Sequence, residues 1–166
     1  MLWANVVKQY QHDYDGECTV IGITALRNKA DVDIHNNILR STTEAMAAVL
    51  GGCDYIGILP FDIRSDETGT LSKRIARNIH HILKHEAHFE EVANAANGAW
   101  YIEHLTDDIA KKAWKLFQDI EVKGGFCECV ESGFINAELA TSAKAREERL
   151  KTGEQVWVGV NKYQPA

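Results

Sequence analysis

The sequence predicts an α/β fold assembled from the repeating unit of a βα barrel. Residues 19–25 and 55–59 are short apolar runs rich in β-branched side chains, which is the composition of strands buried on both faces. Between them, apolar residues recur at three-and-four spacing from residue 38 to residue 50, and two glycines then end the pattern, as expected of a helix. A strand, a helix and a second strand in this order predict one βαβ passage with parallel strands.

The second half of the chain carries mainly helix signals. An apolar stripe within residues 71–83 predicts an amphipathic helix with a charged opposite side. Residues 100–102 predict a short strand, and Thr106, which two aspartates follow, predicts the N-cap of a further helix. That helix is expected to turn one apolar stripe toward a core: Ile109, Ala113, Leu116, Phe117 and Ile120.

Further elements complete the expected order. Residues 2–10 predict the end of a helix, residues 127–131 a short helix, residues 136–151 a longer helix with an exposed charged face, and residues 155–161 a closing strand. A closed barrel needs eight strands and about 250 residues, whereas this chain of 166 residues offers three or four strands. We therefore expect an incomplete barrel that other chains or domains complete, or a smaller open α/β arrangement with covered sheet edges.

Composition limits the classes of function. With 45% hydrophobic and 25% charged residues, the chain is expected to bury a core and to fold compactly. Its formal net charge of −6 argues against nucleic-acid binding, because its lysines and arginines are spread among acids. No segment reaches the roughly 20 apolar residues that cross a bilayer, and residues 1–5 lack the features of a signal peptide. These observations predict a cytoplasmic protein without nucleic-acid or membrane partners.

The cysteines and histidines do not predict a metal site. The four cysteines are too few and too irregularly spaced for a disulfide framework, so we expect reduced thiols. Cys127 and Cys129 lack the second ligand pair of a zinc site. His81, His85 and His88 fall on one helical face, the geometry of a divalent metal site, but a solvated helix face is the favoured interpretation.

Several segments, in order along nearly the whole chain, carry a family resemblance. Residues 33–40 are similar to the pattern Asp-Pro-Tyr-x-Asn-x-x-Arg. Residues 74–78 keep Arg-Ile-Ala-Arg-Asn without change, and residues 98–106 are similar to Gly-Ser-Tyr-Tyr-Ile-Glu-x-Leu-Thr. These segments resemble the substrate-barrel region of the methylmalonyl-CoA mutase family.

The resemblance implies a fold, a reaction and a cofactor. Residues 1–151 would be the C-terminal portion of a (β/α)8 TIM-type barrel, and residues 152–166 a strand after the barrel with the start of a linker. The implied reaction is the interconversion of methylmalonyl-CoA and succinyl-CoA, with adenosylcobalamin in the complete enzyme. The cobalamin-binding pattern Asp-x-His-x-x-Gly begins at Asp33 but has Ile38 in the glycine position. We therefore expect His35 at a helix start, and no cofactor on this chain.

Two strands depart from the catalytic members of the family. Where those members carry His and Gln in the first strand, this chain has Ile21 and Ile23, and residues 54–59 replace Gln-Ser-Leu-His-Thr-Asn. These losses make the chain resemble the small or β subunit, whose role in the family is structural. We therefore expect no catalytic residue and no turnover by this chain alone. The expected partner is a catalytic mutase subunit in a heterodimer, or else a second copy in a homo-oligomer, with acyl-CoA bound by the complete enzyme.

Two alternatives stay open beside this interpretation. In the first, the chain is a fragment of a catalytic subunit that binds the CoA ester. In the second, it is an independent α/β binding protein. Candidate substrate contacts are Arg74, Arg77 and Asp54, although pairing with acids or capping of carbonyls is the favoured interpretation of the arginines. The charged loop at residues 62–67 follows the C-terminal end of a strand, where barrels place function, and is either a substrate loop or a solvated connector.

Overall fold

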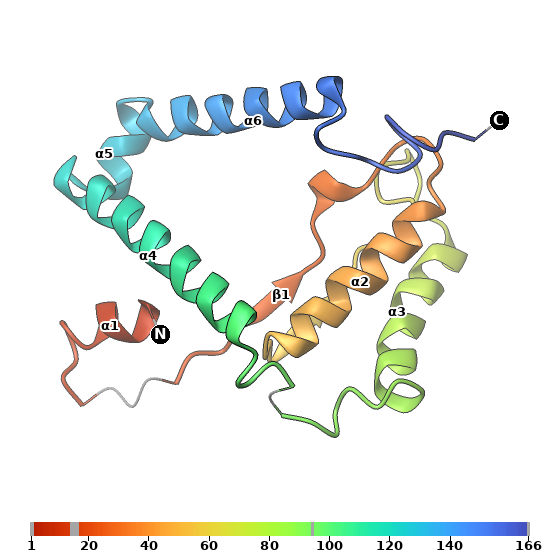
Figure 1. The fold of residues 1–166 in the computed structure, drawn as a ribbon, viewed down its shortest axis with the longest axis horizontal. Coiled ribbons are helices and arrows are strands. Elements are labelled where there is room, and N and C mark those ends of the chain that lie inside the picture. Colours follow the sequence, from red (N-terminus) through yellow and green to blue (C-terminus); the bar gives the residue numbers. More distant parts are fainter. Residues whose placement is uncertain (1, 14–16, 94, 166) are drawn as a thin grey trace. The chain divides into compact units, whose positions relative to one another are not determined.

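The computed structural model describes residues 2–13, 17–93 and 95–165, which fall into two compact units. Cys18–Asn97 with Trp157–Ala166 make the first, which we call the sheet unit. Met1–Glu17 with Gly98–Val156 make the second, the helical unit. Figure 1 follows both along the chain by colour.

The sheet unit contains the predicted βαβ passage. Strand β1 (Ile21–Ile23) pairs in parallel with β2 (Tyr55–Gly57), and α2 (Asn36–Leu50) connects them after a 3-10 turn, η1 (Leu26–Asn28). Helix α3 (Thr70–His85) follows β2. The predicted parallel pair and both helices are thus confirmed.

Both strands are shorter than predicted, because side-chain hydrogen bonds replace the backbone ladder. The backbone N–H of Thr24 still donates to the carbonyl of Gly57 at 3.0 Å. One step later, the N–H of Leu59 donates to Oγ1 of Thr24 at 2.9 Å. Pro60 then has no N–H to offer, so the pairing ends.

The core of the sheet unit lies between α2 and α3, which run side by side in Figure 1. Ala45, Ile79 and Leu83 are buried at its centre, and other apolar side chains pack around them: Met46, Val49, Ile56, Ile58 and Phe89. Gly22 admits α2 to the back of β1, because a Cβ there would lie 3.0 Å from Sγ of Cys53 and 3.4 Å from Cβ of Ala48. Ala45, Met46 and Val49 of the predicted stripe face this core, whereas Leu39 and Leu50 are exposed.

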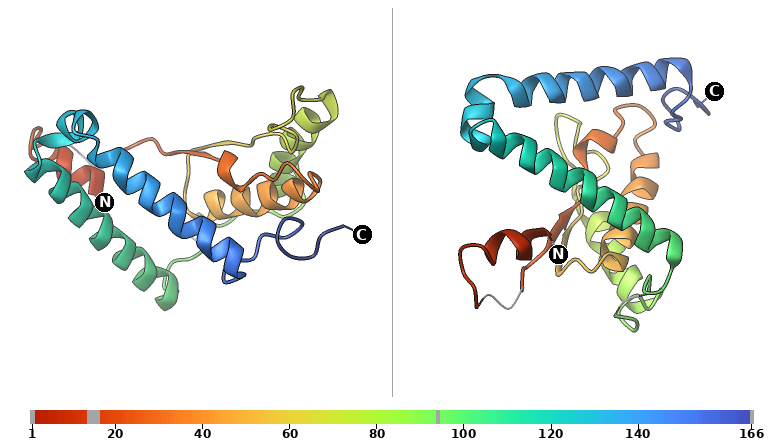
Figure 2. Two further views of the ribbon diagram at one scale, coloured as in Figure 1. Left: turned by 90° about the horizontal axis from the view of Figure 1, so that it is seen from above. Right: turned by 60° about the vertical axis from the view of Figure 1, so that its left-hand side comes forward.

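The helical unit contains α1 (Leu2–Val7), α4 (Trp100–Val122), α5 (Gly125–Glu131) and α6 (Phe134–Thr152). Figures 1 and 2 show α5 as a short connector at one end of both long helices. Inside the unit, the buried thiol of Cys129 on α5 faces the carbonyl of Ile120 on α4 at 3.7 Å. Helices α5 and α6 confirm the two predicted for this region.

The predicted strand at residues 100–102 is wrong, because α4 already begins at Trp100. A carboxylate oxygen of Glu103 accepts a hydrogen bond from the N–H of Gly98 at 2.7 Å and so stabilises this earlier start. Thr106 is not the N-cap: its hydroxyl donates to the carbonyl of Ile102 within the helix at 2.7 Å.

The expected burial of the α4 stripe is also wrong within the part of the chain that the structure describes. No residue of α4 is buried there, and Ile109, Leu116 and Phe117 are exposed. Within the helical unit, Val6 and Tyr10 line one hollow together with Phe117, yet Phe117 stays exposed. Helix α4 is thus amphipathic by sequence and open on its apolar side.

The predicted closing strand is replaced by turns. Val158 and Lys162 form an isolated bridge, and Gly159 adopts a φ of 78°. The N–H of Trp157 donates to Oδ1 of Asn161 at 2.7 Å. A residue in the left-handed region and a side chain that competes for the backbone both oppose an extended run.

Two further expectations concern thiols and membranes. The four cysteines are free, with Cys129 buried and Cys18 and Cys127 exposed. Among residues 2–13, 17–93 and 95–165, no helix combines the length and the apolar character that crossing a bilayer requires.

Candidate functional site

The candidate site lies where β1 and β2 end, because parallel strands direct their C-terminal loops to the same edge of a sheet. The loop after β1 runs to the start of α2, and the loop after β2 runs to the start of α3. Three groups of side chains organise these loops. They centre on Asn37, Glu44 and Asp62.

Asn37 binds the two loops to each other. Its side chain is fully buried, and Oδ1 accepts the N–H of Ala30 at 2.9 Å while Nδ2 donates to the carbonyls of Ala30 and Phe61, each at 2.9 Å. Oδ1 also accepts a guanidinium N–H of Arg40 at 2.7 Å. These four bonds use the full hydrogen-bonding capacity of the amide, so its role is to hold backbone in place.

Arg40 continues this network to the C-terminal segment. Its second terminal nitrogen donates to the carbonyl of Val158, and its guanidinium carbon lies 5.9 Å from the centre of the Trp157 ring. Gly159 packs so closely on the start of α2 that a Cβ there would lie 2.8 Å from Oδ2 of Asp33. We call Asp33, Asn37, Arg40 and Gly159 the clasp.

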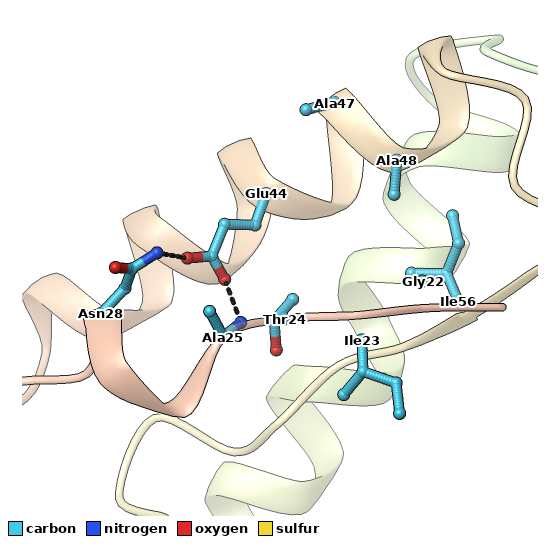
Figure 3. A pocket seen from close by; sticks show the side chains of 9 residues that line it. All are labelled: Gly22, Ile23, Thr24, Ala25, Asn28, Glu44, Ala47, Ala48 and Ile56. Atoms are coloured by element: carbon cyan, nitrogen blue, oxygen red, sulfur yellow. Dashed lines mark hydrogen bonds between the residues drawn. The ribbon is translucent and has the colours of Figure 1, made fainter. Parts of the chain in front are cut away.

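Glu44 organises the first hollow of the site, shown in Figure 3. Its carboxylate accepts hydrogen bonds from the N–H of Ala25 at 3.1 Å, from Nδ2 of Asn28 at 2.7 Å and from Nζ of Lys29 at 3.0 Å. The hollow has a volume of about 270 Å³, and helix α2 contributes Ala47 and Ala48 to its wall. One carboxylate therefore fixes the whole turn that follows β1.

The ion pair between Lys29 and Glu44 is largely buried. The side chain of Lys29 is wholly inaccessible to solvent, and that of Glu44 is 23% exposed. Removing one partner of such a pair lowers the free energy of unfolding strongly, because the remaining charge stays in a poorly solvated place. The geometry marks the pair as a structural element of the turn, without an open approach to the ammonium group.

Asp62 anchors the second loop to α3. One carboxylate oxygen accepts the N–H of Gly69, the N-cap of α3, at 2.9 Å. Burial alone raises the pKa of Asp62, but the nearby Ser72 hydroxyl and the hydrogen bond from the Gly69 backbone outweigh burial, and the pKa is lowered. Asp62 is therefore ionised near neutral pH and suits the positive end of the helix.

A second hollow of about 280 Å³ lies between the two loops and is lined by Ala30, Phe61 and charged side chains. At its rim, Nε and Nη2 of Arg64 donate two parallel hydrogen bonds to the carboxylate of Asp31, with 2.9 Å between Nη2 and Oδ2. This hydrogen bonding lowers the pKa of Asp31. The charged loop predicted at residues 62–67 thus has one anchored carboxylate and one surface ion pair.

The open face of the sheet is apolar. Ile21 and Ile23 are 65% and 67% exposed, and Figure 3 shows Ile23 pointing away from α2. Tyr55 is opposite Ile21 in the parallel register and is 65% exposed. This face offers isoleucine side chains and one phenol, with neither imidazole nor amide on β1.

The predicted substrate residues do not meet at the candidate site. Arg74 and Arg77 are exposed on α3. Asp54 lies at the opposite, N-terminal end of the strands, where its carboxylate accepts the N–H of Val20 at 2.8 Å. Substrate binding by these three residues stays a prediction. The hydrogen bond of Asp54 connects the N-terminal ends of the two strands.

The residues around His35 do not fit a cobalamin site. His35 is the N-cap residue of α2 and its ring lies 5.4 Å from that of Phe61, while Ile38 is already inside the helix. The cobalamin-binding pattern has a glycine where this chain has Ile38. Since Ile38 is helical, the segment has the geometry of a helix start. His81 and His85 stack at 6.1 Å on α3, and no group of three or more metal-ligating side chains occurs among the described residues.

Sequence reasoning missed the Glu44 network and the function of Asn37. The signal for Asn37 was present as part of the resemblance pattern, but a pattern does not say whether a residue binds substrate or backbone. For Glu44, the sequence shows a charged residue within a helix. Nothing in it indicates that Glu44 contacts Asn28 and Lys29, which lie in a loop. Only the return of α2 along β1 places them together.

Comparisons with known proteins agree with the resemblance. Residues 1–166 match the family described as methylmalonyl-CoA mutase. The methylmalonyl-CoA mutase small subunit of Porphyromonas gingivalis is 38% identical over 165 residues, which are 98% of this chain and 27% of that protein. The mitochondrial methylmalonyl-CoA mutase of Bos taurus is 34% identical over 166 residues, 98% of this chain and 22% of that protein.

A probable methylmalonyl-CoA mutase small subunit of Mycobacterium tuberculosis is 35% identical over 167 residues, 98% of this chain and 27% of that protein. The chain thus spans about a quarter of the length of these curated relatives.

Proposed function

Because the chain belongs to the methylmalonyl-CoA mutase family, we propose that it is a barrel-derived part of a mutase small subunit and serves assembly without catalysis of its own. In this proposal, residues 1–151 are the C-terminal portion of the substrate barrel, and residues 152–166 begin the linker. The partner is the catalytic mutase subunit, which holds adenosylcobalamin and the acyl-CoA ester.

The observation that carries the proposal is the apolar open face of β1. Catalytic members of the family present His and Gln from this strand. In this chain, Ile23 points away from α2 in Figure 3, and Ile21, two residues earlier in the strand, shares its face. Isoleucine side chains neither donate nor accept hydrogen bonds, so they cannot orient a carboxylate or a thioester carbonyl. The loss of polar groups at a strand end removes function more directly than any change in the supporting helices.

The polar groups that do surround the strand ends support a structural role. The amide of Asn37 and the carboxylate of Glu44 form their hydrogen bonds with backbone groups and with neighbouring side chains. A site built for substrate keeps polar groups pointed into its cavity. Here, these groups fix the loops instead.

The uncovered apolar surfaces support association with further protein. The stripe on α4 includes Ile102, Leu105, Ile109 and Leu116, all exposed. Contiguous exposed apolar surface of this kind is typical of contact with other protein. Strands β1 and β2 also form a two-stranded sheet with unpaired edges, which a larger sheet would complete.

The deciding experiment measures association and ligand binding separately. The purified chain is mixed with the large mutase subunit of the same organism, and complex formation is followed by analytical ultracentrifugation. We expect a complex, and we expect no turnover by the chain alone with adenosylcobalamin and methylmalonyl-CoA. Turnover by the isolated chain, or no association at any concentration tested, contradicts the proposal.

Matches to proteins named methylmalonyl-CoA mutase, without mention of a small subunit, favour one alternative, a fragment of a catalytic subunit that binds the CoA ester. Under it, Arg74, Arg77 and Asp54 are the proposed substrate contacts. Isothermal titration with methylmalonyl-CoA separates the two: the assembly role predicts no heat of binding. The alternative predicts binding that weakens when Arg74 and Arg77 are replaced by alanine. A chain that binds neither the large subunit nor the ester would be an independent α/β protein.

A further inference from the structure

Helix α3 presents a face whose charges are all positive. Lys73, Arg74, Arg77 and Lys84 are exposed, and no aspartate or glutamate occurs within α3. With 3.6 residues per turn, these four side chains fall within an arc of about 100°. The buried residues of α3 lie on the other side of the helix, in the core with α2. We call the four cations the α3 basic face.

Three lysines of the helical unit are paired within their own helices. Lys111 on α4 pairs with Asp107 at 2.7 Å, one turn away along the same helix. Lys115 on α4 and Lys151 on α6 pair with acids at the same i, i+4 spacing. Pairs of this kind compensate the charge of a helix surface locally. On α3 no acid at this spacing is available, because the helix itself contains neither aspartate nor glutamate.

Compensation is incomplete on α3. Lys84 reaches Glu90 beyond the end of the helix at 2.9 Å. The guanidinium groups of Arg74 and Arg77 form neither an ion pair nor a hydrogen bond within the described residues, although the chain as a whole carries a net charge of −6. Two free guanidinium groups in a chain with excess acid leave a strong local positive potential.

We propose that the α3 basic face docks an acidic surface of the catalytic mutase subunit, an inference that rests on the assembly role proposed above. Lys73 and Lys84 lie about 17 Å apart along a straight helix, a length that suits a row of carboxylates on a protein surface. Arginine is the side chain that best matches carboxylates, through two parallel hydrogen bonds.

Other anionic ligands fit this face less well. Neither hollow of the candidate site is lined by an α3 residue, so a small phosphate ester has no enclosure there. A nucleic acid would meet the excess negative charge of the rest of the chain. An acidic protein surface needs only a straight row of cations, which the helix supplies.

The test reverses charge on α3 and, as a control, elsewhere on the chain. Arg74→Glu with Arg77→Glu changes the net charge by −4, and Lys112→Glu with Lys144→Glu makes the same change at exposed lysines of the helical unit. Affinity for the large mutase subunit is measured at 50 mM and 500 mM salt. Far-UV circular dichroism and thermal unfolding check the fold, and Arg74→Gln with Arg77→Gln provides a milder variant.

We expect the α3 reversal to raise the Kd at least about tenfold at low salt and the control reversal to raise it less than about threefold. The difference should shrink at high salt, because screening weakens exposed charge pairs. Equal Kd values for the two reversals, with wild-type binding intact, overturn this inference alone. Absence of wild-type binding overturns the assembly role itself, and tighter binding of wild type to single-stranded RNA than to the subunit assigns the face to nucleic acid.

Discussion

Replacing Asn37 with alanine should destabilise the sheet unit more than its position in a surface helix suggests. The substitution removes four hydrogen bonds, two to Ala30, one to Phe61 and one to Arg40, at a side chain that is fully buried. At a net value of about 1 kcal/mol for each bond, the expected loss is about 4 kcal/mol. The backbone groups left without partners are enclosed by the loops, so water replaces the amide poorly.

The neighbouring residue provides a matched control. Asn36 undergoes the same chemical change but donates a single side-chain hydrogen bond, to Asp33. Asn36→Ala should therefore cost about 1 kcal/mol or less. Urea unfolding followed by far-UV circular dichroism gives both free energies of unfolding, with equal m-values as the condition for comparing them.

Equal losses for the two variants would refute the role given to Asn37. Should Asn37→Ala fail to fold, Asn37→Asp is the second variant. It keeps the acceptor for Ala30 and Arg40 and loses the two bonds donated to the carbonyls of Ala30 and Phe61. We expect it to cost at least about 2 kcal/mol.

Three further predictions concern the other anchors of the site. Glu44→Ala should cost about 3–5 kcal/mol in urea unfolding, because Lys29 stays buried without its partner, and Lys29→Met combined with Glu44→Met should cost less than Glu44→Ala alone. Gly159→Ala should speed amide hydrogen exchange in residues 157–163, because its φ is 78° and its Cβ would meet a carboxylate at 2.8 Å. Gly153→Ala, with a φ of 76° and open space around the new Cβ, should leave that segment protected. The pKa of Asp62 is lower in the folded state, so its ionised form stabilises the fold above about pH 4, and this contribution disappears as the pH falls through the folded-state pKa. Asp62→Asn should remove that part of the acid sensitivity of the unfolding midpoint, and an unchanged pH profile would contradict the assignment.

Periodicity predicted the sheet unit well because its elements bury their patterns within the unit. The apolar spacing of α2 and α3 predicted the side chains that meet in the core, including Ile79 and Leu83. The runs at β1 and β2 predicted a parallel pair, and their lengths failed only where Thr24 takes over from the backbone.

Prediction failed where local competition decided the backbone. Residues 100–102 have the composition of a strand, but the carboxylate of Glu103 stabilises a helix start just before them. The apolar run at the C-terminus has the composition of a strand too, and Gly159 with Asn161 turns it back on itself. Both outcomes depend on one side chain or one φ value, which composition over several residues does not report.

The sequence predicted where the candidate site lies, but not which side chains form its hydrogen bonds. Parallel strands located the loops, whereas the partners of Asn37 and Glu44 come from segments up to 24 residues away in sequence. Spacing along one chain does not reveal which distant carbonyl an amide will meet. For the same reason, the sequence did not show that Arg74 and Arg77 on α3 lie away from Asp54, which joins the starts of the strands.

The clasp has a consequence for how relatives of this chain are recognised. Its members hold loops and a chain end in place, a need that a working isomerase and an inert scaffold have in common. A search keyed to residues 33–40 will therefore retrieve both kinds of protein and will rank them without regard to chemistry. Under the proposed function, positions 21 and 23 are the better diagnostic, because the catalytic members carry polar side chains there and this chain carries isoleucines.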